Sequence, residues 1–283
     1  MREVLVVASR TLGGAKLLEA VRERAQAEGG ARFRLVVPQS KPKDGYVIYD
    51  EAVRDAAQVR VDLALSSVAG EGIEATGEVG DQDPFSATMD AVAEHRPDEI
   101  VVSTHPAQSS GWLRRDLIER IRNATGLPVE HVVVDLAQEG LPFKVTLVVA
   151  NKTSSGEELI EHLKGVAAGE ERSLFIAIVP QVDGSGDAPR EARARLAKML
   201  DRLGEAGLLS SGMIGDPDPY TATMNALELF NVDEIVISTL PGERSGWLRS
   251  NLIERVRGAT SAHVDHVVVD PQASPTPTPA AAA

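Results

Sequence analysis

Short aliphatic runs alternate along the chain with longer segments of helical spacing. Residues 4–8 form an unbroken aliphatic run, which is typical of a parallel strand buried on both faces. Apolar side chains then recur every three or four positions up to the glycine pair at 29–30, which predicts a helix that ends there. The same alternation predicts further strands over 33–38, 73–79, 99–103 and 131–134, and further helices over 51–69, 84–95 and 112–124.

The second half of the chain repeats the first. Residues 80–135 and 215–270 are identical at 33 of 56 positions without a gap, from GDQDPFSATMDA and GDPDPYTATMNA to HVVVD in both. Earlier segments match more loosely at an offset of 142 residues, so the second copy lacks seven residues between Gln181 and Gly215. A repeat of this length is a whole domain. We predict domains over 1–137 and 144–270, a linker over 138–143, and a disordered tail rich in proline and alanine over 271–283.

Alternating strands and helices in each copy predict an α/β fold. Buried strands joined by helices pack as a parallel sheet that helices cover on both faces. We therefore expect two tandem, doubly wound parallel sheets of five strands each. Such sheets bind ligands at the carboxyl ends of the strands, at the point where the strand order reverses.

Composition excludes several classes of protein. The net charge of -13 argues against a general nucleic-acid binder or a protein of anionic membrane surfaces, because both need an excess of lysine and arginine. The absence of cysteine excludes disulfides, thiolate metal sites and cysteine nucleophiles. The sequence shows neither a signal peptide nor an apolar stretch of membrane-spanning length, so we expect a cytoplasmic protein without nucleic-acid or membrane partners.

Polar residues follow the first and fourth predicted strands of each copy. If the strand order reverses there, a ligand cleft is lined in copy one by Ser9, Arg10, Thr11, Ser103 and Thr104, and in copy two by Asn151, Lys152, Thr153, Ser238 and Thr239. The hydroxyl groups suit ribose or phosphate, and equally suit nearby backbone groups. Two glycines, Gly14 and Gly156, either allow a ligand close to the backbone or belong to a turn. Val37 and Val179, near the ends of the second strands, complete these candidates.

The loop before the fourth helix contains Ser-Gly-Trp-Leu-Arg in both copies. Its candidate ligand residues are Ser110, Gly111 and Arg114 in copy one, and Ser245, Gly246 and Arg249 in copy two. One interpretation is an anion site, built from backbone N–H groups, a hydroxyl and a guanidinium that binds phosphate with two hydrogen bonds. The other is structural, with the serine capping the helix, the tryptophan covering the sheet edge and the arginine in solvent.

The remaining polar repeats favour structural roles. His131 and His266 hold matching places on the fifth strand without a second ligand at metal spacing, which favours packing over catalysis. Asp83 and Asp218 precede prolines and are expected to cap helices. No Ser-His-Asp order, Walker loop or dinucleotide motif occurs, so we predict neither catalytic residues nor a metal site.

The repeated motifs resemble the universal stress protein family. GDxDPxxATMxA after the third strand, DEIVVST at the fourth, the Gly/Ser loop and the ending PVEHVVVD carry the resemblance, which extends over nearly the whole chain. It implies a Rossmann-like fold of the HUP type with strand order 3-2-1-4-5, dimerisation through the fifth strand and, in one subgroup, ATP binding. In a tandem member it also implies a pseudo-dimer of the two domains, with a homodimer as a further form.

The chain departs from the ATP-binding subgroup at two motifs. That subgroup carries an acidic residue after the first strand, where this chain has Ser9-Arg10 and Asn151-Lys152. Of its glycine motif, each copy keeps one glycine, Gly111 or Gly246. We therefore predict a non-catalytic stress-response or regulatory module whose two pockets hold an adenine nucleotide with Mg2+ or another phosphate-bearing ligand, with slow ATP hydrolysis at most. The alternative is a ligand-free scaffold for protein interactions, whose pockets its own tryptophan loops fill. An enzyme of the same fold is a third class, which needs a catalytic metal or an acid-base group.

Overall fold

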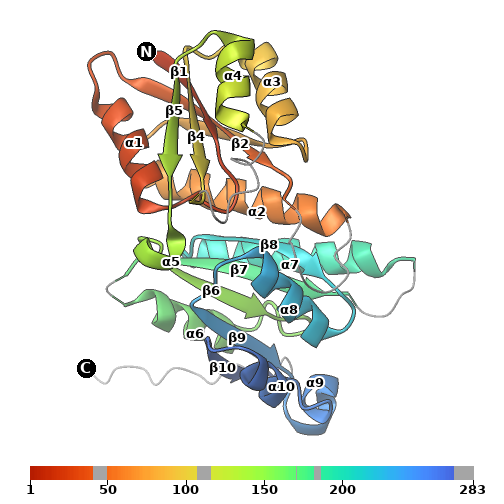
Figure 1. The fold of residues 1–283 in the computed structure, drawn as a ribbon. Coiled ribbons are helices and arrows are strands. Elements are labelled where there is room, and N and C mark those ends of the chain that lie inside the picture. The colour runs from red at the N-terminus through yellow and green to blue at the C-terminus, as the bar shows by residue number, and fades with distance from the viewer. Residues whose placement is uncertain (41–49, 107–115, 170, 182–185, 271–283) are drawn as a thin grey trace, which may run out of the picture.

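The computed structural model describes the chain except residues 41–49, 107–115, 170, 182–185 and 271–283. The described part contains two five-stranded sheets, which lie one after the other along the chain (Figure 1). The predicted tail lies outside the described residues. None of the described helices combines the length and the apolar character needed to cross a membrane.

The first sheet has the order β3-β2-β1-β4-β5, and all its described pairings are parallel. Its strands are β1 (Arg2–Val7), β2 (Ala31–Pro38), β3 (Ala75–Gly80), β4 (Glu99–Thr104) and β5 (Val129–Val133). Its helices are α1 (Ala15–Gln26), α2 (Asp50–Ala69), α3 (Pro84–His95) and α4 (Leu117–Thr125), with the short α5 (Leu136–Glu139) after the last strand. The predicted alternation is confirmed, and the order reverses between β1 and β4.

The second sheet repeats this topology with the order β8-β7-β6-β9-β10, again parallel. Its strands are β6 (Lys144–Val149), β7 (Ser173–Pro180), β8 (Ser210–Gly215), β9 (Glu234–Thr239) and β10 (His263–Val268). Its helices are α6 (Glu157–Ala167), α7 (Ala188–Glu205), α8 (Pro219–Leu229), the 3-10 turn η2 (Gly242–Arg244), α9 (Gly246–Arg249) and α10 (Leu252–Ala259). The predicted α/β fold of two tandem doubly wound sheets is therefore confirmed.

Several predicted boundaries differ from the structure. The first, second and fifth strands begin two residues before their predicted starts, at Arg2, Ala31 and Val129. The third strand begins at Ala75 rather than Ile73, because Gly72 with φ +73° turns the chain directly before it. The single helix predicted over 112–124 begins at Leu117 in the described part of copy one. In copy two the same segment is two helices, α9 and α10, which are separated at Asn251 by a left-handed backbone with φ 54°. Asp116, directly before α4, adopts the same conformation with φ 48°.

Apolar side chains from the strands form a core on each face of each sheet. On one face of the first sheet, Val4 and Val6 pack with α1 through Leu17 and Val21. On the other, β1 and β4 pack with α3 and α4. Side chains of successive strand residues point to opposite faces, which is why the continuous aliphatic runs could be recognised as strands covered on both sides.

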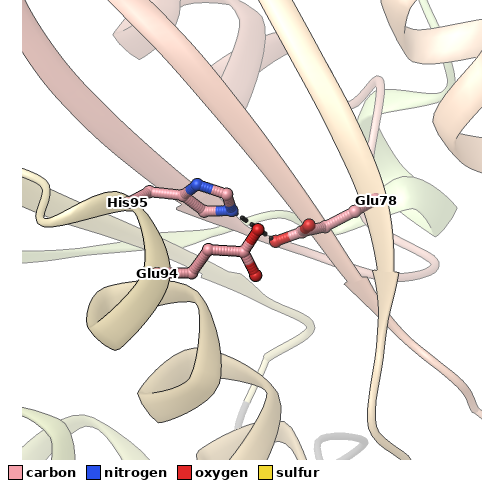
Figure 2. Close-up of side chains that lie close together, drawn as sticks. All are labelled: Glu78, Glu94 and His95. Carbon is pink, nitrogen blue, oxygen red and sulfur yellow. Dashed lines mark hydrogen bonds and ion pairs between the residues drawn. The ribbon is translucent and has the colours of Figure 1, made fainter.

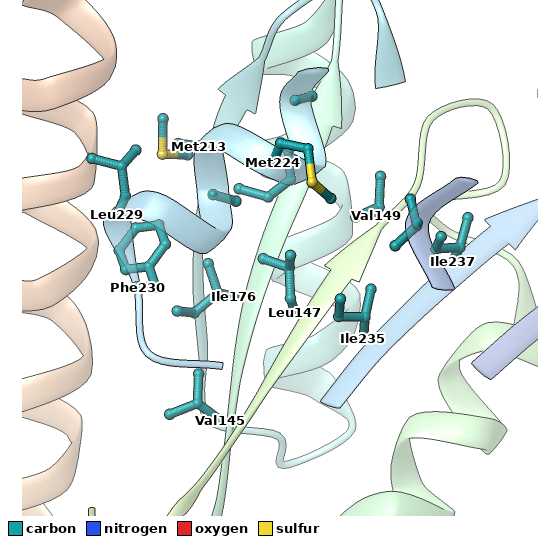
Figure 3. Packing of buried hydrophobic residues seen from close by; sticks show 14 of the residues in the cluster. Val145, Leu147, Val149, Ile176, Met213, Met224, Leu229, Phe230, Ile235 and Ile237 are labelled. Carbon is teal, nitrogen blue, oxygen red and sulfur yellow. The ribbon is translucent and has the colours of Figure 1, made fainter. Parts of the chain in front are cut away.

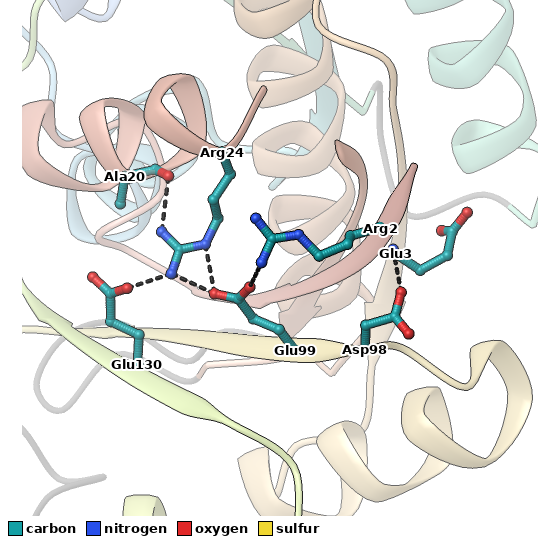
Figure 4. Close-up of polar contacts among 7 residues, drawn as sticks. All are labelled: Arg2, Glu3, Ala20, Arg24, Asp98, Glu99 and Glu130. Carbon is teal, nitrogen blue, oxygen red and sulfur yellow. Dashed lines mark hydrogen bonds and ion pairs between the residues drawn. The ribbon is translucent and has the colours of Figure 1, made fainter. Parts of the chain in front are cut away.

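Partly buried and exposed charges lie at the amino ends of the first sheet. Arg24 on α1 hydrogen-bonds Glu99 at the start of β4 over 2.6 Å, and pairs with Glu130 on β5 (Figure 4). Arg2 reaches the same Glu99 over 3.5 Å. These contacts tie α1 to two strands at the end opposite the candidate cleft, so they position the sheet without contributing to a ligand site.

The two halves meet through helix α2, which runs between the sheets (Figure 1). Its residues Ala57 and Val61 pack on its own sheet. Its residues Ala56, Val59 and Leu63 belong to the core of the second half, beside Met213, Leu229 and Phe230 (Figure 3). Arg172 adds hydrogen bonds to the carbonyls of Ser66 and Ser67. The second core is thus completed by a helix from the first half.

The expected contact through the fifth strand is not the one that joins the described halves. In the described residues β5 pairs with β4 alone and β10 with β9 alone, each at the edge of its own sheet. The segment predicted as a linker contains the end of α5 and then Leu141 and Phe143, which pack against the second core. It is therefore in contact with the second half.

Candidate functional site

The candidate cleft residues lie where the strand order reverses, at the carboxyl ends of β1 and β4 and of β6 and β9. Ser9 is buried and hydrogen-bonds the carbonyl of Pro38 at the end of β2 over 3.4 Å, and its hydroxyl lies 2.8 Å from that of Ser40. Its counterpart Asn151 donates to the carbonyl of Pro180 over 3.1 Å. Both residues thus hold the end of one strand against the end of the next.

In both copies the residue after Ser9 or Asn151 is a cation that faces solvent. Arg10 and Lys152 are exposed at the start of the turn that leads into α1 and α6. Val37 and Val179 are fully buried in the second strand of each sheet, so their side chains are core residues. A ligand at the cleft would therefore meet a positive charge on the first-strand wall in each copy.

The threonine hydroxyls at the ends of β4 and β9 are hydrogen-bonded to histidine side chains. Thr104 Oγ1 donates to the carbonyl of His105 over 2.9 Å and lies 2.8 Å from His131 Nε2. Because a hydroxyl has one proton, the histidine donates the second hydrogen bond. Thr239 and His266 repeat this geometry, with 3.1 Å to the Leu240 carbonyl and 2.8 Å to Nε2. Sequence reasoning missed this pairing, although matching His and Thr in both copies was a usable signal.

The two histidines share an electrostatic environment. Burial lowers the pKa of His131, and the nearby Arg122 lowers it further. Burial and Arg257 lower the pKa of His266 in the same way. Both imidazoles are therefore neutral at neutral pH and act as hydrogen-bond donors to threonine, which fits the packing role expected from the sequence.

The paired glycines approach the end of the fifth strand. A Cβ on Gly14 would lie 2.3 Å from Val134 Cγ1, and a Cβ on Gly156 would lie 2.2 Å from Val269 Cγ1. Real Cβ atoms do not approach other atoms this closely. Both glycines are therefore required by the packing of a helix start against the segment after β5 or β10, which is the turn interpretation.

The loop before the fourth helix is described only in copy two. Ser245 is buried and its hydroxyl accepts a hydrogen bond from Leu248 N over 3.2 Å, so it caps α9. Trp247 packs against the second core, and Arg249 is exposed. The atom Arg249 Nη2 lies 3.7 Å from the position of a Cβ on Gly246. Ser110, Gly111, Trp112 and Arg114 of copy one lie outside the described residues.

The acidic repeats before α3 and α8 are confirmed as caps. Asp83 accepts from Ser86 N over 3.1 Å, and Asp218 accepts from Thr221 N over 2.9 Å. Asp81 and Asp216 each accept the backbone N–H two residues later over 2.8 Å. These carboxylates bind the protein's own backbone at helix starts.

Several buried polar atoms at the reversal points have no hydrogen-bond partner within the described chain. In copy one these are Thr11 Oγ1 and Ser103 Oγ, and in copy two Asn151 Oδ1 and Ser238 Oγ. Thr153, the counterpart of Thr11, does have a partner, because its hydroxyl donates to the Ser238 carbonyl over 3.1 Å. Buried polar groups are rarely left unpaired, so both reversal points hold unused hydrogen-bonding capacity.

Two clusters of possible metal ligands were not predicted from the sequence. Glu78 on β3 lies beside Glu94 and His95 at the end of α3, with 3.0 Å between Glu78 Oε1 and His95 Nε2 (Figure 2). Glu234, His263 and Asp265 form a second cluster. The members of each cluster come from different elements, so their spacing in the sequence gave no metal signature.

Two hollows between α2 and the second half were also missed. One, of about 110 Å³, includes Glu51, Asp55 and Asp216, and burial raises the pKa of the Asp55 carboxyl. The other, of about 70 Å³, includes Ser9, Arg10 and Arg60. They arise from contact between the halves, which the pattern within one copy does not encode.

Comparison with known proteins found matches of structure alone, since no family model and no curated protein matches the sequence. A universal stress protein from Archaeoglobus fulgidus is 17% identical, with 94% of this chain and 96% of that chain covered and a TM-score of 0.34. A candidate universal stress protein from Pseudomonas aeruginosa is 16% identical over 95% and 93% of the two chains, with a TM-score of 0.31. A functionally unknown protein from Pseudomonas aeruginosa is 16% identical over 95% and 92%, with a TM-score of 0.30. Two of these three structures thus carry the name of the family that residues 80–135 and 215–270 resemble.

Proposed function

We propose that the protein is a tandem universal-stress-type protein, a non-catalytic regulatory module that binds a phosphate-bearing ligand in each half. The ligand lies at the carboxyl ends of β1 and β4 in the first half, and of β6 and β9 in the second. An adenine nucleotide with Mg2+ is the ligand that the family resemblance favours. The protein acts in the cytoplasm by changing its contacts when the ligand binds.

The observation that carries this proposal is the set of partnerless polar atoms at both reversal points. Ser103 Oγ and Ser238 Oγ hold equivalent places at the ends of β4 and β9, and both are buried without a partner in the described residues. An unpaired buried hydroxyl costs stability, of the order of 1–3 kcal/mol. A ligand oxygen would remove that cost in each half.

The residues present fit a phosphate better than a ribose. A ribose hydroxyl is best held by a carboxylate after the first strand, and Arg10 and Lys152 occupy that wall instead. These two cations and the neighbouring hydroxyls would hold the phosphate oxygens of a bound nucleotide. When bound, Mg2+ would neutralise part of the phosphate charge.

One group of contacts favours the alternative, a ligand-free interaction scaffold. Thr104 and Thr239 are occupied by histidines, Ser245 caps its own helix, and Trp247 packs on the core. In that case the partnerless hydroxyls are structural costs of the fold, and the exposed surfaces carry the function.

Calorimetric titration with ATP and Mg2+ to millimolar nucleotide separates the two functions. We expect a saturable signal with a stoichiometry of two, and at least tenfold weaker binding at one site in Ser103→Ala and at the other in Ser238→Ala. Neither variant should lower the melting temperature of the free protein, because alanine removes an unpaired polar group whose burial is costly. Thr146→Val is the matched control, since Thr146 Oγ1 is also buried without a partner but lies near the start of β6. A flat titration of the wild type would favour the scaffold.

A further inference from the structure

A cavity between the two halves combines apolar walls with a buried cation. Its volume is about 70 Å³. Arg60 on α2 and Arg10 after β1 supply positive charge, while Phe143, Ile176 and Phe230 from the second half supply apolar surface. The described lining contains no Asp or Glu.

Arg60 is the polar centre of this cavity. Only 8% of the residue is exposed. Its Nη2 donates to the carbonyl of Leu229, the last residue of α8, over 2.6 Å, and its guanidinium lies 5.4 Å from the centre of the Phe230 ring. Its Nη1 is buried and has no hydrogen-bond partner within the described chain.

Among the described residues that line the cavity, no carboxylate balances the charge of Arg60. Burial lowers the pKa of Arg60 to about 10, and the positive charge of Arg10 contributes. The guanidinium therefore stays charged at neutral pH, in a place where an unpaired charge is costly. An anion near Nη1 would offset that cost.

The equivalent arginine of the second half has an acidic neighbour that Arg60 lacks. Gly77 and Gly212 hold equivalent places, because each pairs with an equivalent residue of the neighbouring strand. Arg60 on α2 and Arg195 on α7 precede these glycines by the same number of residues, so the two arginines correspond. Arg195 lies 3.6 Å from Glu191, one helical turn earlier. The residue at that place in α2 is Ala56. The first copy thus has the arginine without its acidic neighbour.

We propose that this cavity is a binding site for a small organic anion, a monocarboxylate whose charged end contacts Arg60 and whose apolar body packs against the second half. A carboxylate oxygen would accept a charge-assisted hydrogen bond from Arg60 Nη1, which has no partner within the described chain, while Nη2 keeps its bond to the Leu229 carbonyl. The cavity shares Ser9 and Arg10 with the wall of the first proposed nucleotide cleft, whereas Arg60 on α2 and the apolar residues of the second half belong to the cavity alone.

The cavity volume limits the size of the ligand. One water needs about 10–15 Å³ of such volume, so the cavity holds about five to seven non-hydrogen atoms. Butyrate has six and carries one charge, which makes it a suitable probe. Because the cavity joins both halves, its occupation would stabilise their contact.

The test is thermal unfolding and calorimetric titration of the full chain with sodium butyrate, against sodium chloride at equal ionic strength. We expect butyrate to raise the melting temperature of the wild type, and Arg60→Met to weaken butyrate binding at least tenfold. Arg60→Met should fold, since an apolar side chain replaces an unpaired buried charge. Arg60→Gln is the second variant, because it keeps a donor for the Leu229 carbonyl and lacks the charge.

Three controls decide the outcome. Arg172→Met removes another arginine of the same interface that does not line the described cavity, and it should bind butyrate as the wild type does. Butanol, which lacks the charge, should leave the melting temperature unchanged, and any effect of inorganic phosphate, which would bind the nucleotide clefts, should persist in both Arg60 variants. No butyrate effect on the wild type, a butyrate effect on the Arg60 variants as large as on the wild type, an equal effect of butanol, or a phosphate effect that both Arg60 variants lose would overturn the proposal.

Discussion

Helices α2 and α7 hold the same place in the two halves and have opposite surroundings. Each covers its own sheet, α2 through Ala57 and Val61 and α7 through the equivalent Ala192 and Leu196. Only α2 has a second buried side. The corresponding side of α7 faces solvent. One copy of the duplicated helix is therefore buried between the halves, and the other lies at the surface.

Three positions of each helix account for this difference. Ala56, Val59 and Leu63 lie on one helical face and are 0%, 1% and 8% exposed. Their counterparts in α7 are Glu191, Ala194 and Lys198, all exposed. A helix with apolar residues all round is a buried helix, whereas one apolar stripe is typical of a surface helix. The contact between the halves is consequently one-sided, since α7 makes no equivalent contact in the described residues.

The largest effect is expected where the two helices differ most. Leu63→Lys places in α2 the residue that α7 carries, and it buries a charge in the second core. We expect the free energy of unfolding to fall by about 3 kcal/mol or more, because an unpaired buried charge costs at least this much. Urea unfolding followed by circular dichroism measures the change.

The reverse substitution is the matched control. Lys198→Leu on the exposed side of α7 should change the free energy of unfolding by about 0.5 kcal/mol or less. Equal losses in the two variants would mean that the second face of α2 is not an interface.

A smaller effect separates two arginines that cross the same interface. Arg172 donates to the carbonyls of Ser66 and Ser67 over 2.9 and 3.0 Å, near the carboxyl end of α2, where a cation is favoured. We expect Arg172→Met to cost about 2 kcal/mol, because two charge-assisted hydrogen bonds are lost. Urea unfolding at low ionic strength gives this value.

Arg193 provides the comparison for that experiment. It pairs across the interface with Glu51, but both side chains are at least half exposed. Arg193→Met should therefore cost about 0.5 kcal/mol or less. If Arg193→Met cost as much as Arg172→Met, surface charge rather than buried hydrogen bonding would hold the halves together.

Sequence pattern predicted the sheets well because the signals lie within one copy. The aliphatic runs at β1 and β6, and the Asp-Pro starts of α3 and α8, depend on neighbours close in the chain. The left-handed conformation of Asp116 and Asn251 was missed, since the apolar spacing continues through each of these residues. A change of backbone conformation at one polar position leaves little trace in such a pattern.

The candidate site was less predictable, because side chains meet there from distant segments. The positions of Ser103 and Ser238 at the reversal point followed from topology, whereas the binding of Thr104 to His131 depends on the register of β4 against β5. The buried charge of Arg60 depends on contact with the other half, although the loss of its acidic neighbour at Ala56 could have been noticed by aligning the copies.

The smallest effect concerns a feature in which the two halves agree. The lowered pKa values of His131 and His266 mean that the unfolded chain binds protons at a higher pH than the folded chain. Stability is therefore fully present above the unfolded pKa of about 6.5, and it falls as the pH drops from there toward the lowered folded values. The slope cannot exceed about 1.4 kcal/mol per pH unit for each histidine.

Substitution of each histidine tests whether the halves contribute equally. We expect His131→Gln and His266→Gln each to remove part of the loss of stability between pH 7 and 5, measured by urea unfolding, while glutamine still donates to the threonine. Similar changes in His131→Gln and His266→Gln would mean that the halves differ at α2 and α7 and not at their fifth strands. A change in one variant alone would mean that the duplicated sheets have diverged as well.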